Sequence, residues 1–216
     1  MSDDDPVNPN RLDQAAAAIV AAGRRLGDRR LVVAAEGNLS IRLGDRLLVT
    51  PSGRRKDKLT PELLLLVSAD PEAPRSDPDR PTLRPTSDLR IHRAVYAARS
   101  DVGAVAHAHL PSSLALTLAG LVPDPMALPE TALLLPRLPF VPQMAMGSPE
   151  LARAIAGSLT DGIEPPATAV LLERHGVVAV GSTLDEAVDR IELVDLLCRV
   201  WRDAILLGMP AVSGET

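Results

Sequence analysis

The sequence predicts a single α/β domain of three layers, α/β/α, around a mixed and mostly antiparallel central sheet. The chain has 216 residues, enough for one sizeable domain with a hydrophobic core and too few for two domains. Short apolar runs of strand length are interspersed with longer segments of helical periodicity. Because these segments do not alternate strictly, as the units of a parallel βαβ sheet would, we expect a layered domain whose sheet is largely antiparallel.

The first half of the chain opens with an expected helix at Arg11–Leu26, a segment rich in alanine and followed by Gly27. Short strands should come next, separated by turns at glycine and proline; they are Leu31–Val33, Leu39–Leu43, Arg46–Thr50 and the apolar run Leu63–Ser68. Residues 70–85 contain five prolines. This composition indicates a surface excursion and not a linker between domains.

The middle of the chain predicts a strand at Gly103–His109 between two helices, Ser87–Ala98 and Pro111–Ala119. Residues Glu130–Val141 are apolar, but two prolines interrupt them. Proline cannot donate a hydrogen bond to a neighbouring strand, so this segment should be a bent edge strand or a loop.

The last third of the chain carries two helix starts. Ser148 before Pro149 is a typical N-cap followed by proline at the first helical position. Thr183, with Glu186 three residues later, predicts a capping box at the start of a long helix that reaches about Leu207. Two strands are expected between these helices, Thr168–Leu172 and Val177–Gly181.

Composition excludes several classes of function. The chain has one Trp, one Tyr and one Phe and a net charge of −5, whereas nucleic-acid binding usually needs aromatic faces and a basic surplus. The single cysteine, Cys198, lies in an apolar helical stretch and indicates a buried position. No apolar run approaches the roughly 20 residues of a membrane span, and the acidic N-terminus is unlike a signal peptide. We therefore expect a cytoplasmic protein with no nucleic-acid or membrane partner.

Two of the four histidines, His107 and His109, lie two residues apart on a predicted strand. Residues i and i+2 of a strand point to the same face, roughly 6.5–7 Å apart, so both imidazoles can reach one ion. His175 ends another apolar strand and precedes Gly176, which permits a tight turn. Three imidazoles with one open position are typical of a catalytic zinc site. The alternative is that each histidine is a hydrogen-bonded core residue.

A series of motifs, in this order, resembles the class II aldolase/adducin family, which includes fuculose-1-phosphate and rhamnulose-1-phosphate aldolases. The resemblance covers roughly residues 10–207, so that residues 1–10 would be a disordered leader, 11–209 a class II aldolase-like domain and 210–216 a tail. The segments that carry it are Glu36–Ser40, Thr50–Gly53, Lys58–Pro61, Pro85–Asp88, His92, Arg99–His109 and Leu172–Gly181.

The resemblance implies a role for each matching position. His107, His109 and His175 match the family's metal ligands, and the expected cofactor is a divalent cation, Zn²⁺ ahead of Mn²⁺, Co²⁺ or Mg²⁺. The positions that match the loops binding the substrate phosphate are Gly37, Asn38, Ser52, Gly53, Thr86 and Ser87. Small residues and neutral donors of this kind suit an anion, although each loop taken alone could be an ordinary turn.

Asp88 matches the family's acid/base, where the aldolases mostly carry glutamate and the ribulose-phosphate 4-epimerases carry aspartate. A carboxylate beside a divalent ion can transfer a proton; the other reading of Asp88 is a helix cap. His92 lies four residues later on the same helix face and is expected to be structural or to orient this carboxylate. Tyr96 does not match the tyrosine that family aldolases place on the aldehyde half, and the region 128–141 offers Glu130 and Phe140 instead.

The implied activity is reversible cleavage of a small ketose 1-phosphate to dihydroxyacetone phosphate and an aldehyde. The sugar would be of the fuculose, rhamnulose or 5-deoxypentulose type, and the enzyme a homo-oligomer, expected to be a tetramer. Three alternatives remain open at this point: a sugar-phosphate 4-epimerase, dehydratase or decarboxylase on the same scaffold, a non-catalytic interaction domain like that of adducin, and a structural zinc protein.

Overall fold

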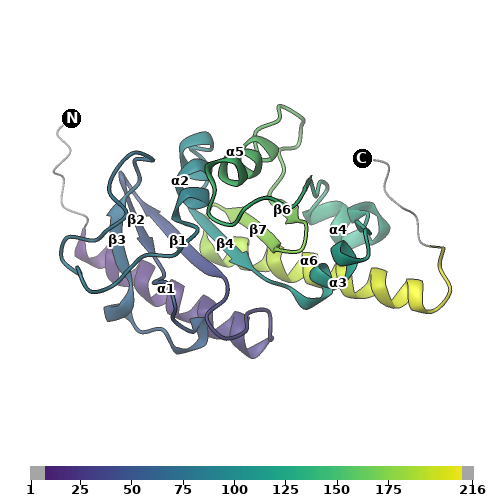
Figure 1. The fold of residues 1–216 in the computed structure, drawn as a ribbon, viewed down its shortest axis with the longest axis horizontal. Coiled ribbons are helices and arrows are strands. Elements are labelled where there is room, and N and C mark those ends of the chain that lie inside the picture. Colours follow the sequence, from purple (N-terminus) through teal and green to yellow (C-terminus); the bar gives the residue numbers. More distant parts are fainter. Residues whose placement is uncertain (1–7, 211–216) are drawn as a thin grey trace.

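A seven-stranded sheet forms the centre of the molecule, which is described for residues 8–210 in a computed structural model (Figure 1). The strand order is β3-β2-β1-β4-β7-β6-β5, and every neighbouring pair is antiparallel except the parallel pair β5–β6. The strands are β1 (Asn38–Leu43), β2 (Arg46–Val49), β3 (Leu65–Ser68), β4 (Ala104–Ala108), β5 (Phe140–Val141), β6 (Ala169–Leu172) and β7 (Gly176–Gly181). The expected mixed, mostly antiparallel sheet is confirmed.

Helices cover both faces of the sheet. The α-helices are α1 (Pro9–Asp28), α2 (Leu89–Ala98), α3 (Pro111–Leu118), α4 (Pro129–Leu134), α5 (Pro149–Ser158) and α6 (Leu184–Leu206), with short 3₁₀ helices η1 (Lys56–Lys58), η2 (Pro61–Leu63) and η3 (Pro125–Ala127). Figure 1 shows α2 and α5 on one side of the sheet and α1 and α6 on the other. The three-layer α/β/α domain is confirmed.

Two hydrophobic cores follow from the alternation of side chains along the strands. Ala104, Ala106 and Ala108 of β4 pack with α1, α3 and α6, while Val105 packs with α2 and α5. Successive strand residues point to opposite faces, so both faces of the central strands must be apolar. The aliphatic sequence supplies these residues, and Cys198 is fully buried in α6, as expected.

One expected strand is wrong, and a second prediction is only partly confirmed. Residues Leu31–Val33 lie between two turns and form no strand: Arg30 and Ala34 on either side adopt positive φ values of 59° and 52°, and Leu31 is buried in the core. Within Glu130–Val141, the first part belongs to α4, which Pro129 starts at the first helical position. Only Phe140–Val141 is an edge strand, so that prediction is half right.

The ends of the helices refine the other predictions. Helix α1 continues through Gly27 to Asp28. A Cβ on Gly27 would lie 2.5 Å from Cβ of Asp57, so the missing side chain lets α1 contact η1. At α6, Thr183 accepts from the Glu186 N–H as expected, but the Glu186 carboxylate accepts from Ser182 and not from Thr183. Of the expected leader and tail, residues 1–7 and 211–216 lie outside the described residues; residues 9 and 10 are already helical.

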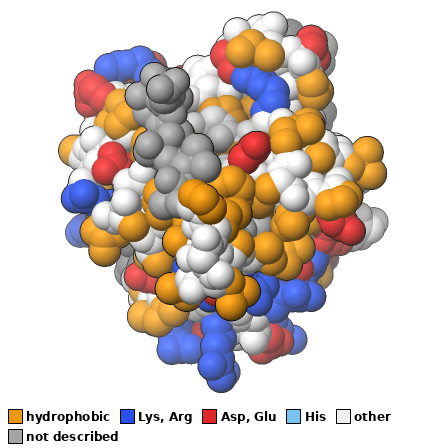
Figure 2. Space-filling view, turned by 90° about the vertical axis from the view of Figure 1, so that its right-hand side faces the viewer, with side chains coloured by type: hydrophobic (Ala, Val, Ile, Leu, Met, Phe, Trp, Pro, Cys, Tyr) orange, Lys and Arg blue, Asp and Glu red, His pale blue; other side chains and the backbone are white. Residues whose placement is uncertain are grey.

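One end of the molecule, formed by α3, η3, α4 and the C-terminal turn of α6, exposes large apolar side chains (Figure 2). We call this set the apolar end; its members are Leu118, Met126, Leu133, Leu134, Leu206 and Leu207. Leu133 is 78% and Leu207 is 90% exposed. Exposed apolar residues gathered in this way are typical of a contact surface for another protein.

None of the helices within residues 8–210 combines the length and the apolar character needed to cross a membrane.

Candidate metal centre and active site

The end of β4 places two of the predicted ligands side by side. Antiparallel pairing sets His107 opposite Asn38 on β1 and Val178 on β7, and His109 follows the last strand residue, Ala108. The two Nε2 atoms are 2.9 Å apart. The same-face geometry that the spacing predicts is therefore present, although His109 itself lies just beyond the strand.

A tight turn brings the third histidine to the same place. Gly176 has a φ of +115°, and a Cβ on it would lie 2.2 Å from the carbonyl oxygen of Ala108. Only glycine allows the start of β7 to approach the end of β4 so closely. The preceding Arg174 is also in the left-handed region, with a φ of 53°. This turn directs His175 toward the other two histidines.

The three imidazoles surround one point. Their ring centroids are 4.7, 4.9 and 5.0 Å apart, with interplanar angles between 63° and 75°. One ligand atom of each residue lies within 4.8 Å of the others. The structure thus brings together all three residues predicted as metal ligands.

Burial keeps these imidazoles in the neutral form that binds metals. It lowers the pKa of His107 well below its usual value, and the neighbouring imidazoles add to this effect. Burial also lowers the pKa of His109, against the opposing charge of Glu36, and that of His175. Neutral rings need lose no proton before they coordinate an ion.

The donor set fits a divalent cation. Nδ1 of His107 lies 2.9 Å from the carbonyl oxygen of Val177. A carbonyl only accepts, so Nδ1 carries the proton and Nε2 keeps its lone pair. Nε2 of His175 is buried and has no hydrogen-bond partner among residues 8–210, which is costly unless a ligand occupies it. Glu36, which was not predicted, has a carboxylate oxygen 3.8 Å from Nδ1 of His109.

Asp88 is buried beside this centre, and it does not cap α2. It occupies the N-cap position, yet its side chain makes no capping hydrogen bond. Oδ2 accepts from Nδ2 of Asn38 at 2.8 Å, and Oδ1 is buried with no partner within the described residues. Its negative charge acts on the pKa of both His109 and His175. The helix-cap reading of the sequence is therefore wrong.

A directional chain of hydrogen bonds supports Asp88 from behind. Asn38 donates to the carboxylate, so its Oδ1 accepts from Nε2 of His92 at 2.6 Å. Nδ1 of His92 then accepts from the Ser40 hydroxyl at 2.6 Å, and Tyr96 donates to the Ser40 carbonyl at 3.0 Å. Burial lowers the pKa of His92 to about 4, which keeps the ring neutral. His92 therefore orients Asp88 through Asn38, and Tyr96 is a buried part of this chain.

Hydrogen bonds join the three segments that contain the six predicted phosphate-binding residues. Segments 50–52 and 84–86 are joined by hydrogen bonds from Ser52 N to Arg84 O (2.8 Å) and from Thr86 N to Thr50 O (3.1 Å). Thr50 in turn bonds Leu39, which follows Gly37 and Asn38. Ser52, Gly53 and Ser87 are exposed, whereas Thr86 is buried and its hydroxyl accepts from the Asp88 N–H.

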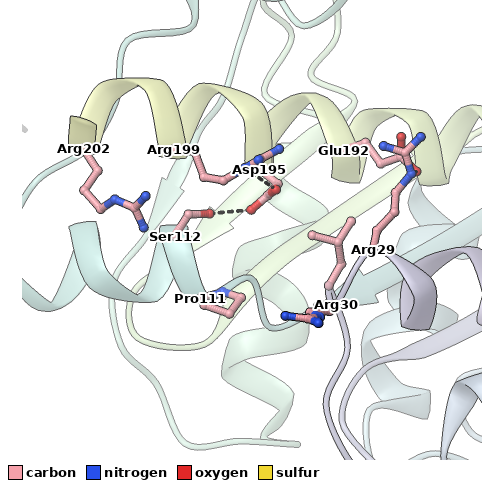
Figure 3. Close-up of a pocket in the computed structure, with 9 residues that line it drawn as sticks. Arg29, Arg30, Pro111, Ser112, Glu192, Asp195, Arg199 and Arg202 are labelled. Carbon is pink, nitrogen blue, oxygen red and sulfur yellow. Dashed lines mark hydrogen bonds and ion pairs between the residues drawn. The ribbon is translucent and has the colours of Figure 1, made fainter. Parts of the chain in front are cut away.

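Two of the cavities within the described residues border α6 and the turn before β7, respectively. A cleft of about 380 Å³, which we call the arginine cleft, contains none of the predicted site residues, and its carboxylates are paired: Asp195 with Ser112 and Arg199, and Glu192 with Arg29 (Figure 3). A smaller cavity of about 60 Å³ touches His175; its lining mixes apolar side chains, among them Met144, Met146 and Leu172, with the polar Gln143, Glu173 and Arg174.

An α/β/α domain with three convergent imidazoles and an adjacent buried carboxylate defines a metal-dependent enzyme. Comparison with known proteins gives the family: residues 17–202 match the model of the class II aldolase and adducin N-terminal domain. The chain belongs to the class II aldolase/adducin family, so the predicted resemblance is confirmed.

Three similar proteins illustrate the family. The 5-methylthioribulose-1-phosphate/5-deoxyribulose-1-phosphate aldolase of Rhodospirillum rubrum is 31% identical over 85% of this chain and 79% of its own length. The 3-oxo-tetronate 4-phosphate decarboxylase of Cupriavidus necator is 29% identical over 85% and 81%. The structure of l-fuculose-1-phosphate aldolase from Thermus thermophilus superimposes with a TM-score of 0.77 at 26% identity, covering 92% of this chain and 100% of that one. The expected carbon–carbon lyase of the class II aldolase type is confirmed at the level of the family.

Proposed function

We propose that this protein is a metal-dependent aldolase that reversibly cleaves a small ketose 1-phosphate to dihydroxyacetone phosphate and an aldehyde. The observation that carries the proposal is the convergence of three neutral imidazoles beside a buried carboxylate, one oxygen of which has no partner among residues 8–210. A purely structural zinc site would normally have four ligands, usually including cysteine. A non-catalytic domain would have no use for a buried carboxylate held in this way.

His107, His109 and His175 would hold the ion, and we propose Zn²⁺ because three imidazoles with an open position suit it. Mn²⁺, Co²⁺ and Mg²⁺ are the alternatives to test. The bound ion supplies Lewis-acid polarisation of the substrate carbonyl. The carbonyl of Val177 fixes the tautomer of His107. The carboxylate of Glu36 raises the pKa of His109 against the larger effect of burial.

Asp88 is the proposed acid/base. In cleavage, the bond between C3 and C4 breaks, its electrons stay on the dihydroxyacetone phosphate half, and the C4 hydroxyl becomes the aldehyde as its proton passes to the Asp88 carboxylate. Asp88 then delivers a proton to C3 from its carboxyl group, and it removes that proton in the reverse direction. The chain through Asn38 and His92 holds the carboxyl group in place while it changes protonation state.

The phosphate would bind to the exposed turns of Ser52–Gly53 and Ser87, with Gly37, Asn38 and Thr86 behind them. The N–H of Ser52 is already bonded to Arg84, so Ser52 would contribute its hydroxyl. Anchoring the phosphate away from the reacting carbons turns its binding energy into orientation of the substrate.

The small cavity beside His175 supports a sugar with an apolar end. Met144, Met146 and the leucines of its lining offer flexible apolar contacts beside the polar Gln143, Glu173 and Arg174, and no residue of this lining carries a hydroxyl group. Tyr96 is buried elsewhere, in the chain behind Asp88. We therefore propose a 5-deoxy or thio-substituted pentulose 1-phosphate ahead of fuculose or rhamnulose 1-phosphate.

A turnover assay tests this function. Purified protein loaded with each metal is incubated with ketose 1-phosphates, a pentulose 5-phosphate and a 3-oxo-aldonate phosphate, and dihydroxyacetone phosphate is measured. Release of dihydroxyacetone phosphate with an aldehyde supports the aldolase. Release of CO₂ instead would support a decarboxylase, which the Cupriavidus relative makes the second candidate; epimerised or dehydrated products would likewise replace the aldolase, and no turnover of any compound would contradict an enzyme.

We also propose that the protein acts in the cytoplasm as a homo-oligomer, with four copies as the family resemblance implies. The apolar end supports a contact between copies, because its six exposed side chains lie on neighbouring elements. The occupant proposed for this surface is a second copy of the same chain.

A further inference from the structure

Lys56 is a buried cation that the proposed reaction does not yet use. Its side chain is only 2% exposed, and within residues 8–210 it forms no ion pair with a carboxylate. Nζ donates instead to two main-chain carbonyls, those of Ala35 at 2.8 Å and Arg54 at 2.7 Å. A lysine is rarely buried without a charged partner, so its position calls for an explanation.

The two carbonyls belong to the two turns expected to bind the phosphate. Ala35 lies two residues before Gly37, and Arg54 directly follows Gly53. Lys56 therefore spans the space behind both turns and connects them. An ammonium group has three donors, and these carbonyls use two of them.

The packing around η1 shows how the lysine is kept there. A Cβ on Gly23 would lie 2.2 Å from the carbonyl oxygen of Lys56, and one on Gly27 would lie 2.5 Å from Cβ of Asp57. Two glycines four residues apart on α1 thus let this helix press against η1. This packing holds the charged side chain of Lys56 in a buried position and keeps it from solvent.

The charge of Lys56 interacts with Asp88 and His109 of the proposed active site. Burial lowers the pKa of Lys56 to about 8 against the opposing charge of Asp88, and Lys56 adds to the effect of burial, which is the main cause of the lowered pKa of His109. The six residues predicted to bind phosphate are all neutral. A fixed positive charge behind them would favour a dianion by direct Coulomb attraction, since the ammonium group itself is buried.

We propose that Lys56 is a positioning residue for the substrate phosphate: it ties the turn at Ala35–Asn38 to the turn at Ser52–Arg54 and supplies positive charge to a neutral phosphate cradle. This inference rests on the proposed function for its choice of ligand. It predicts a site for a phosphate group that exists whether or not a given sugar is cleaved.

The chain offers a matched control, since Lys58 is its only other lysine, lies two residues away and is exposed. Inorganic phosphate is titrated calorimetrically into metal-loaded and chelator-treated protein. Lys56→Met should raise the dissociation constant at least about tenfold in both forms, whereas Lys58→Met should leave it within about twofold. Lys56→Gln keeps donors and loses the charge, so it should also weaken phosphate binding, and more steeply at low salt.

A measurement on the wild type covers the case in which the Lys56 variants do not fold. With ¹³C-labelled lysine the protein has two Cε signals, which Lys58→Met assigns. Phosphate should shift the Lys56 signal saturably and leave the Lys58 signal in place. An unmoved Lys56 signal, or equal phosphate binding by Lys56→Met and Lys58→Met, would overturn the proposal. Failure of every ketose phosphate in the turnover assay would refute the aldolase but would leave this result standing.

Discussion

At the level of single residues, Asp88 is the proposed proton-transfer group. Its Oδ1 is buried and unpartnered among the described residues, and its side chain does not cap α2. Asp88→Asn keeps size and polarity and removes the proton-transfer group, so turnover should fall by roughly 10²–10⁴-fold. Metal content should stay at the wild-type level. Steady-state kinetics and elemental analysis measure the two quantities; near-normal turnover would exclude Asp88 and direct attention to Glu130, which is exposed on α4.

His92 predicts a loss of stability in acid. The unfolded chain takes up a proton near the usual value of 6.5, whereas the buried ring does so only at about pH 4. Unfolding is therefore favoured progressively as the pH falls from about 6.5 to 4, by up to roughly 3 kcal/mol from this residue. His92→Gln keeps a donor and an acceptor and should flatten this slope. Denaturant unfolding of both chelated proteins between pH 4 and 7 checks this; identical slopes would contradict it.

Some residues of the site could be predicted from the sequence and others could not. His107 and His109 were found because the period of a strand places i and i+2 on one face. The hydrogen bond between Asn38 and Asp88 joins residues 50 positions apart in the sequence. The burial of Lys56 depends on two glycines of α1. No local pattern contains such contacts, so the sequence alone indicated neither.

At the scale of elements, the turn before β7 positions the third histidine. Gly176→Ala combines a φ of +115° with a contact of 2.2 Å to the Ala108 carbonyl, so it should displace His175, weaken metal binding at least about tenfold and lower the melting temperature by several degrees. Gly208→Ala is the matched control: its φ is +104°, but the Cβ would meet nothing within 4 Å. It should cost only about 1 kcal/mol and leave metal affinity unchanged. Equal effects of both changes on metal binding would contradict this role.

Element boundaries were predictable where capping chemistry is local. Ser148 and Thr183 both accept from the N–H three residues later, as their sequences indicated. The strand predicted at Leu31–Val33 was wrong, because Leu31 and Val32 are buried in succession although no strand within the described residues pairs with them. Apolar runs of three residues do not distinguish a strand from a turn that fills the core.

At the scale of the whole molecule, the apolar end predicts self-association. A charge in a buried contact between copies is strongly unfavourable, so Leu133→Glu should shift the protein toward a smaller species in sedimentation velocity. Ile163→Glu changes an exposed residue outside this surface, 56% exposed, and should sediment like the wild type. A wild type that is already monomeric at micromolar concentration would contradict the proposed oligomer.

The proposed mechanism depends on one ion held by three histidines. Elemental analysis of purified wild type, His109→Ala and His92→Gln measures this most directly. We predict about one divalent ion per chain in the wild type and in His92→Gln, because the His92 ring bonds Asn38 and not the ion. His109→Ala should lose most of the metal, since His109 supplies one of the three convergent nitrogens. Equal metal content in the wild type and His109→Ala would contradict the metal centre and the mechanism built on it.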